Sequence, residues 1–152
     1  MRIMQLYRAS KRGASKAASN GAYEPKPRRF AMTDLHAKQT RNIETARRFF
    51  ELMHRKDIDS WGELWAENGR IIVFYPPAGF GDSIDGKAAI VAAFKGLFGN
   101  FESFESELTA IYPAADSESV VVEYRNRAVI VGGTEYTNSN IAVFRYCGVS
   151  FR

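Results

Sequence analysis

Six polar or ionisable residues are expected to gather on one face of a β-hairpin near the end of the chain. Two stretches rich in β-branched residues flank Gly132 and Gly133, which match a two-residue hairpin turn. Such a turn pairs Val131 with Thr134. Because side chains alternate along a strand, one face then carries a polar set: Glu123, Arg125, Arg127, Tyr136, Asn138 and Asn140.

These residue types can perform acid–base chemistry if the face lines a pocket. Glu123 would move a proton, while Tyr136 and Asn138 would donate hydrogen bonds to a developing oxyanion. Arg125 and Asn140 would contact the substrate; alternatively, Arg125 holds Glu123 in a structural ion pair. The face can also be a solvated surface, which is common in open antiparallel sheets. A pairing shifted by one residue would move every side chain of one strand to the other face.

Apolar residues at helical spacing predict three helices. The first spans about 41–56 with Thr40 as its N-cap, and the second is short and lies within 58–65. The third follows Gly86 and has its apolar stripe between residues 90 and 98. Two of these helices precede every predicted strand, and the third precedes most of them.

The strands follow from alternation and from turn residues. A strand at 70–75 ends at Pro76, because proline cannot donate to a β-ladder. A second, at 104–112, ends at Pro113, and the hairpin arms at 120–131 and 134–146 come next. Another strand begins at Val149. Helices followed by a strongly bent antiparallel sheet indicate an α+β fold.

Composition restricts the function classes. With one cysteine, Cys147, no intramolecular disulfide can form, and with only two histidines we expect no metal site or haem. No apolar run is long enough to cross a bilayer, and no signal-peptide core is visible, so we expect a cytoplasmic protein without a membrane partner.

The charge is unevenly distributed along the chain. Residues 1–31 hold eight basic residues and one acid, whereas residues 32–152 carry a net charge of −3 within the total of +4. Residues 1–31 also lack apolar periodicity, so we expect a basic disordered tail ahead of one domain at 32–152. A solvated extension, or a natural start at Met32, is the favoured interpretation. Nucleic-acid binding, an organelle transit peptide and membrane contact are the alternatives.

The order of several short motifs resembles the SnoaL-like branch of the nuclear-transport-factor-2-like superfamily, particularly its ketosteroid-isomerase-like and phenazine-biosynthesis-like members. The resemblance covers about residues 40–152. The matching segments are LWAENG at 64–69, YPPAGF at 75–80, IDGKAAI at 84–90, VVVEY at 120–124, YTN at 136–138 and VFRY at 143–146.

The resemblance implies a cone-shaped α+β barrel in which three helices close over a curved sheet around a deep apolar cavity. It also implies a homodimer, a small hydrophobic ligand and no cofactor. An active member would be an isomerase, cyclase, lyase or epoxide-hydrolase-like enzyme that uses carboxylates with Tyr or His donors. The aromatic residues expected to line such a pocket are Trp61, Trp65, Tyr75, Phe80 and Phe94, although Trp61 and Trp65 at this spacing also suit a core.

The chain departs from the family pattern in two places. The helix after Gly86 lacks the histidine that phenazine-type relatives place there. The last strand ends at Arg152, before the pocket glutamate that relatives carry, so we expect a truncated last strand. The alternative function is therefore a non-catalytic ligand-binding or dimerisation domain.

Overall fold

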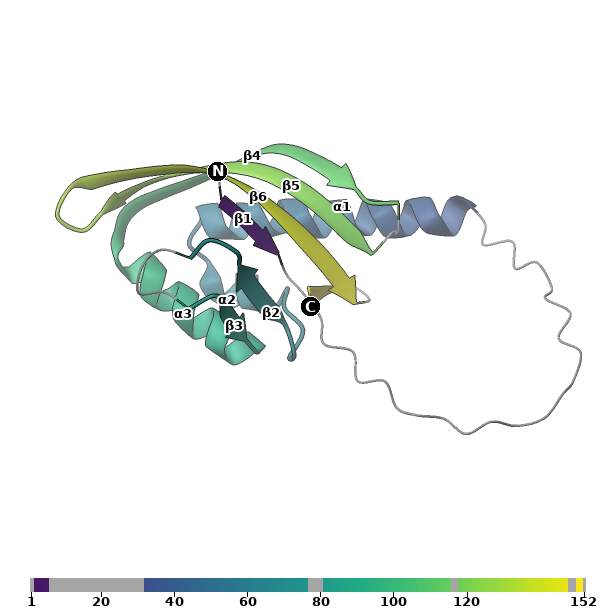
Figure 1. The fold of residues 1–152 in the computed structure, drawn as a ribbon, viewed down its shortest axis with the longest axis horizontal. Coiled ribbons are helices and arrows are strands. Elements are labelled where there is room, and N and C mark those ends of the chain that lie inside the picture. Colours follow the sequence, from purple (N-terminus) through teal and green to yellow (C-terminus); the bar gives the residue numbers. More distant parts are fainter. Residues whose placement is uncertain (1, 6–31, 77–80, 116–117, 148–149, 152) are drawn as a thin grey trace, which may run out of the picture.

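Three helices lie against one side of a bent, mainly antiparallel sheet in a computed structural model of the chain (Figure 1). The structure describes residues 2–5, 32–76, 81–115, 118–147 and 150–151. The α+β class predicted from the sequence is confirmed.

The helices are α1 (Met32–His54), α2 (Ile58–Gly62) and α3 (Lys87–Gly99). Helix α1 begins well before the expected start, so Thr40 lies inside the helix and is not its N-cap. No proline or glycine interrupts 32–40, and Asp34 in the first turn favours the helix dipole. Asp57 caps α2, where its carboxylate accepts a hydrogen bond from the Ser60 amide at 3.1 Å.

The strands are β1 (Arg2–Gln5), β2 (Arg70–Val73), β3 (Ser83–Asp85), β4 (Phe101–Pro113), β5 (Ser119–Ile130), β6 (Thr134–Cys147) and β7 (Ser150–Phe151). They are ordered β3-β2-β1-β6-β5-β4, and β7 also pairs with β6. The long strands β4, β5 and β6 arch over the helices, and the β5–β6 hairpin projects beyond them (Figure 1).

The edges of this order, β3 and β4, are not paired with each other in the described ranges. The sheet is therefore open, and the cone-shaped barrel that the resemblance implies is not confirmed. Strand β7 consists of Ser150 and Phe151. Phe151 pairs with Tyr146 in β6 and also forms a bridge with Trp65, so β7 ties the sheet to the segment after α2.

One part of the predicted tail has regular structure. Arg2–Gln5 form β1, which pairs parallel to β6 and antiparallel to β2. The expectation of disorder throughout 1–31 is wrong for these four residues, because two neighbouring strands supply backbone partners that the local sequence does not reveal. Residues 6–31 lie outside the described part.

The hairpin pairing differs by one residue from the prediction. Ile130, not Val131, pairs with Thr134, so the loop has three residues. Val131 leaves the ladder because its amide donates to the Asn100 carbonyl at 2.9 Å, and the Gly133 amide donates to the Ile130 carbonyl at 2.9 Å. This one-residue shift changes which side chains share a face.

As a result, the predicted polar face is divided. Tyr136, Asn138 and Asn140 lie on the inner face, which the helices cover, while Glu123, Arg125 and Arg127 lie on the outer face. The prediction that all six residues share one face is wrong. Buried inner-face residues on both hairpin strands identify the covered side: Val120, Val122, Tyr124, Ala128, Ala142, Phe144 and Tyr146.

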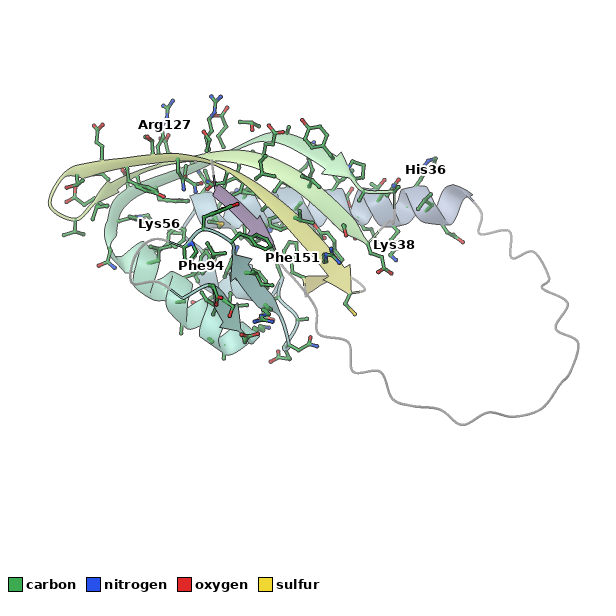
Figure 2. The ribbon with its side chains drawn as sticks, viewed as in Figure 1. His36, Lys38, Lys56, Phe94, Arg127 and Phe151 are labelled. Carbon is green, nitrogen blue, oxygen red and sulfur yellow. The ribbon has the colours of Figure 1, made fainter. Side chains whose placement is uncertain are left out.

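Aromatic side chains fill the space between the sheet and the helices. The ring of Phe49 lies 4.9 Å from Phe144, 5.4 Å from Phe151 and 5.2 Å from Trp61. Phe94 of α3 stacks on Trp61 at 4.5 Å. Figure 2 shows Phe94 and Phe151 between the helices and the sheet. The innermost part of the fold is thus a packed aromatic core.

Candidate functional site

A cluster of amide and hydroxyl side chains lies on the inner face of the three long strands. Ser106 of β4 is opposite Asn126 of β5, which is opposite Asn138 of β6. Tyr136 and Asn140 occupy the next inner positions on either side of Asn138. We call these residues the inner polar cluster: Ser106, Asn126, Tyr136, Asn138 and Asn140.

Hydrogen bonds join the cluster into two groups. Asn138 and Asn140 form a reciprocal amide pair, with Nδ2–Oδ1 distances of 3.2 and 2.9 Å, and Asn138 Nδ2 also donates to the Tyr136 hydroxyl at 2.8 Å. Separately, the Ser106 hydroxyl donates to Asn126 Oδ1 at 2.7 Å. Asn140 is buried, with 7% of its surface exposed, whereas the other members are half-buried.

Donor capacity in the cluster remains available to a ligand. The Tyr136 oxygen accepts from Asn138, and within the described residues its O–H proton has no acceptor. Asn126 accepts from Ser106, and its amide NH₂ donates to no residue that the structure describes. Two groups of donors therefore lie on the same face, on neighbouring strands. An acceptor oxygen of a ligand is the chemical partner that they suit.

The surroundings of the cluster are apolar and keep a nearby phenol neutral. Tyr124 is opposite Asn140 and packs on Phe50 at 4.8 Å between ring centroids. Burial, and to a smaller extent the neighbouring Tyr136, raises the pKa of Tyr124 well above its usual range. On β4, Phe104 and Leu108 lie on the inner face on either side of Ser106. A polar patch within an apolar wall suits an amphipathic small molecule.

Glu123 lies outside this cluster. It is on the outer face, opposite Ile141, where the Tyr112 hydroxyl donates to its carboxylate at 3.4 Å. Arg125, also on the outer face, is exposed and opposite Ser139. Glu123 therefore cannot act with Tyr136 and Asn138 as one catalytic set, because the sheet separates them.

The hollows along the hairpin are also on the outer face. One of about 280 Å³ is lined by Glu123, Arg125 and Ser139, and another of about 500 Å³ by Arg127, Glu135 and Thr137. Both hollows are open to solvent. The deep apolar cavity implied by the resemblance is not shown, because aromatic rings fill the inner space near the helices.

The residues expected as pocket walls have different environments. Trp61 and Trp65 are core residues, with 0% and 2% of their surfaces exposed, and their indole N–H groups have no acceptor in the described ranges. Phe94 is half-buried against Trp61. Tyr75 is 65% exposed, and Phe80 lies outside the described residues.

Two residues of the inner polar cluster, Ser106 and Asn126, are not among the candidates that the sequence offers. They join the cluster only in the observed pairing. A signal was present, because Tyr124 and Asn126 alternate with Glu123 and Arg125. Only the register in which β5 pairs with β6 decides whether Tyr124 and Asn126, or Glu123 and Arg125, share a face with Asn138.

The inner-face positions of β4, β5 and β6 hold no carboxylate and no imidazole within the described residues. In the same described part, no group of three or more His, Cys, Asp or Glu residues is placed to hold a metal ion. Nor does it contain a helix that is both long and apolar enough to span a membrane. The inner polar cluster can bind and polarise an acceptor oxygen, but it lacks an internal base.

Three helices on one side of a bent, open sheet define the class as an α+β fold. The SnoaL-like domain model matches residues 46–147, so the chain belongs to the SnoaL-like family. This confirms the resemblance found in the sequence motifs.

Similar proteins agree with this assignment. The uncharacterised protein YesE of Bacillus subtilis (strain 168) is 37% identical over 101 residues, which cover 66% of this chain and 69% of YesE. A solved structure of a candidate isomerase from Bacillus subtilis is 32% identical, with a TM-score of 0.62 and coverage of 75% of this chain and 83% of that one. A phenazine-biosynthesis-related protein from Pseudomonas aeruginosa, at 18% identity, shares the fold with a TM-score of 0.66 and 80% coverage of both chains.

Proposed function

We propose that this protein binds a small hydrophobic compound that carries a hydrogen-bond acceptor oxygen. The observation that supports this proposal is the donor capacity of the inner polar cluster. The Tyr136 hydroxyl and the Asn126 amide can each donate to a ligand, and the reciprocal pair of Asn138 and Asn140 keeps Tyr136 in place. Because these donors are held before the ligand arrives, binding costs little reorganisation.

The apolar neighbours of the cluster favour a hydrophobic ligand body. Phe104 and Leu108 flank Ser106, and Tyr124 and Ala128 flank Asn126, all on the same face. A ketone, an epoxide or an aromatic acid combines an apolar body with an acceptor oxygen. We therefore propose that the bent sheet and its helices form the cone-shaped receptacle for such a compound.

The experiment is a thermal-shift screen of hydrophobic ketones, epoxides and aromatic acids, followed by titration calorimetry of any hit. Tyr136→Phe and Asn126→Ala should each weaken binding about fivefold, since one lost hydrogen bond is worth about 1 kcal/mol. Ser139→Ala is the matched control, because Ser139 is exposed on the outer face of the same strand. Equal affinity in all four proteins would contradict the proposal.

A second candidate is an enzyme of the isomerase type, favoured by the likeness to the candidate isomerase at 32% identity. Donors that bind a carbonyl oxygen also stabilise the oxyanion formed when a neighbouring proton is removed. The proton would have to be taken by a group other than Glu123, which is on the outer face. This candidate would be supported by turnover of a ketone under two conditions. Glu123→Gln should leave the turnover unchanged, and Tyr136→Phe should lower it.

We also propose a homodimer that forms through the outer face. There Glu105 is opposite Arg127 and Glu107 is opposite Arg125, so a row of acidic side chains on β4 lies beside a row of basic side chains on β5. A surface with this pattern can meet a second copy of itself in opposite orientation. Light scattering should give twice the chain mass, and the paired reversal Arg125→Glu with Arg127→Glu should lower the fraction of dimer.

A further inference from the structure

Strand β1 joins two parts of the sheet that do not otherwise pair. In the described strands, β2 and β6 have no direct ladder, and each of them pairs with β1. Met4 is opposite Val73 on one side and opposite Ala142 on the other. The chain therefore fills this seam with a segment from its N-terminus (Figure 1).

Removal of β1 would leave two open edges facing each other. On β6 the edge would be 140–143, and on β2 it would be 72–73. Further along the same edge, Tyr146 and Cys147 of β6 pair with β7. Facing strand edges present unpaired N–H and C=O groups, which bind an extended segment by adding a strand.

The connection of β1 to the rest of the fold makes exchange between copies possible. The 26 residues from 6 to 31 separate Gln5 from α1. A chain of that length can span at most about 90 Å, which is more than the width of a domain of this size. A long connection lowers the effective concentration of a chain's own β1 at its seam. The same strand from a second copy can therefore compete with it for the seam.

We propose that the seam between β2 and β6 is a strand-acceptor site, and that Arg2–Gln5 of one chain can occupy the seam of a second copy. The partner is thus a second copy of this chain, recognised through backbone hydrogen bonds in the register that β1 has here. The proposal is independent of the proposed function. It predicts a dimer linked by exchanged strands, in which each copy completes the sheet of the other.

The first test is a cross-link between two differently tagged full-length chains in which Cys147→Ser removes the native thiol. One chain carries Ile3→Cys and the other Ile141→Cys, because Ile3 and Ile141 are directly opposite. Neighbouring strands lie about 4.8 Å apart, which a disulfide can bridge. After mixing and oxidation we expect a mixed disulfide-linked dimer.

Two controls determine what the cross-link means. A single chain with both Ile3→Cys and Ile141→Cys should form an internal disulfide, which reports the seam within one copy. Glu135→Cys in place of Ile141→Cys should give no mixed dimer, because Glu135 pairs with Val129, far along β6 from the seam. If the internal disulfide forms but the mixed dimer does not, strand exchange between copies is excluded. If neither disulfide forms, the pairing of β1 with β6 is itself wrong.

The second test measures hydrogen exchange in the full chain with Met4→Pro, which removes a backbone donor from β1. Amides in 140–143 should exchange at least about tenfold faster than in a Met4→Val control, while β5 amides around Val122 stay protected. Excess peptide of residues 1–8 should restore protection in the Met4→Pro chain, and the same peptide with proline at its fourth residue should not. Lost protection that the peptide does not restore would overturn the proposal.

Discussion

Asn126 lies directly opposite Asn138 across β5 and β6, on the side of the sheet that faces the helices. This pair places two amide side chains on one inner face with Ser106, Tyr136 and Asn140. A pairing one residue away would have placed Arg127 opposite Asn138. The position of the candidate ligand site thus follows from a single residue in the hairpin loop.

The amide network should stabilise the fold as well as the site. Asn138→Ala removes the donor to the Tyr136 hydroxyl and leaves Asn140 without its reciprocal partner. We expect a loss of about 1–2 kcal/mol in the free energy of unfolding, measured by urea denaturation. Ser139→Ala, on the exposed outer face of the same strand, should change it by less than about 0.5 kcal/mol. Equal losses in the two variants would show that the network contributes nothing.

The hairpin loop depends on its glycines. Gly133 has φ 84°, a left-handed conformation that side chains with a Cβ rarely adopt. Gly133→Ala should destabilise the protein by about 1 kcal/mol. Gly96→Ala is the control of opposite sign, because Gly96 is exposed in α3 with open space around it. At that position alanine should stabilise the helix by about 0.5–1 kcal/mol. Thermal unfolding of the two variants and of the natural protein measures both changes.

The packing of α2 on α3 requires a glycine at position 62. A Cβ at Gly62 would lie 2.7 Å from Cγ2 of Val91. Gly62→Ala should therefore cost about 1–3 kcal/mol. Val91→Ala in the same chain should recover part of this loss, since it removes the clashing methyl group. A double-mutant cycle on unfolding free energies measures the coupling, and additive effects would contradict the contact.

A buried tyrosine links the first helix to the sheet. The Tyr146 hydroxyl donates to the Asn42 carbonyl at 2.7 Å, and burial raises the pKa of Tyr146 far above its usual range. Tyr146→Phe should cost about 1 kcal/mol at neutral pH.

The same tyrosine should influence alkaline unfolding. The folded state keeps the phenol protonated while the unfolded chain ionises it near its ordinary pKa of about 10. Its contribution to stability is complete below about pH 10 and falls as the pH rises toward the folded-state pKa. Unfolding free energies at pH 8 and pH 11 should therefore differ less in Tyr146→Phe than in the natural protein. An unchanged difference would mean that other groups cause the alkaline loss.

Much of the fold could be read from local patterns. Helical spacing around Phe49 and Phe50, the turn at Gly132 and Gly133, and the strand that begins at Arg70 each reflect short-range backbone chemistry. The expected end of that strand next to Pro76 is wrong, because β2 ends at Val73. The start of α1 was misplaced because its first residues carry no apolar stripe, although nothing in them prevents a helix. The order of the motifs was sufficient to indicate the family, which the comparison with the SnoaL-like model confirmed.

The amino-acid sequence by itself determined the α+β class, most strands and the two-glycine hairpin. Only the tertiary structure decided the register, because two glycines fit a two-residue or a three-residue loop equally well. Burial of Val122 and packing of Phe144 on Phe49 of α1, together with the hydrogen bond from the Val131 amide to the Asn100 carbonyl, select the longer loop. Since side chains alternate with a period of two, that choice places Glu123 outside and Asn126 inside. Strand β1 was likewise beyond local patterns, because its partners are distant in the chain.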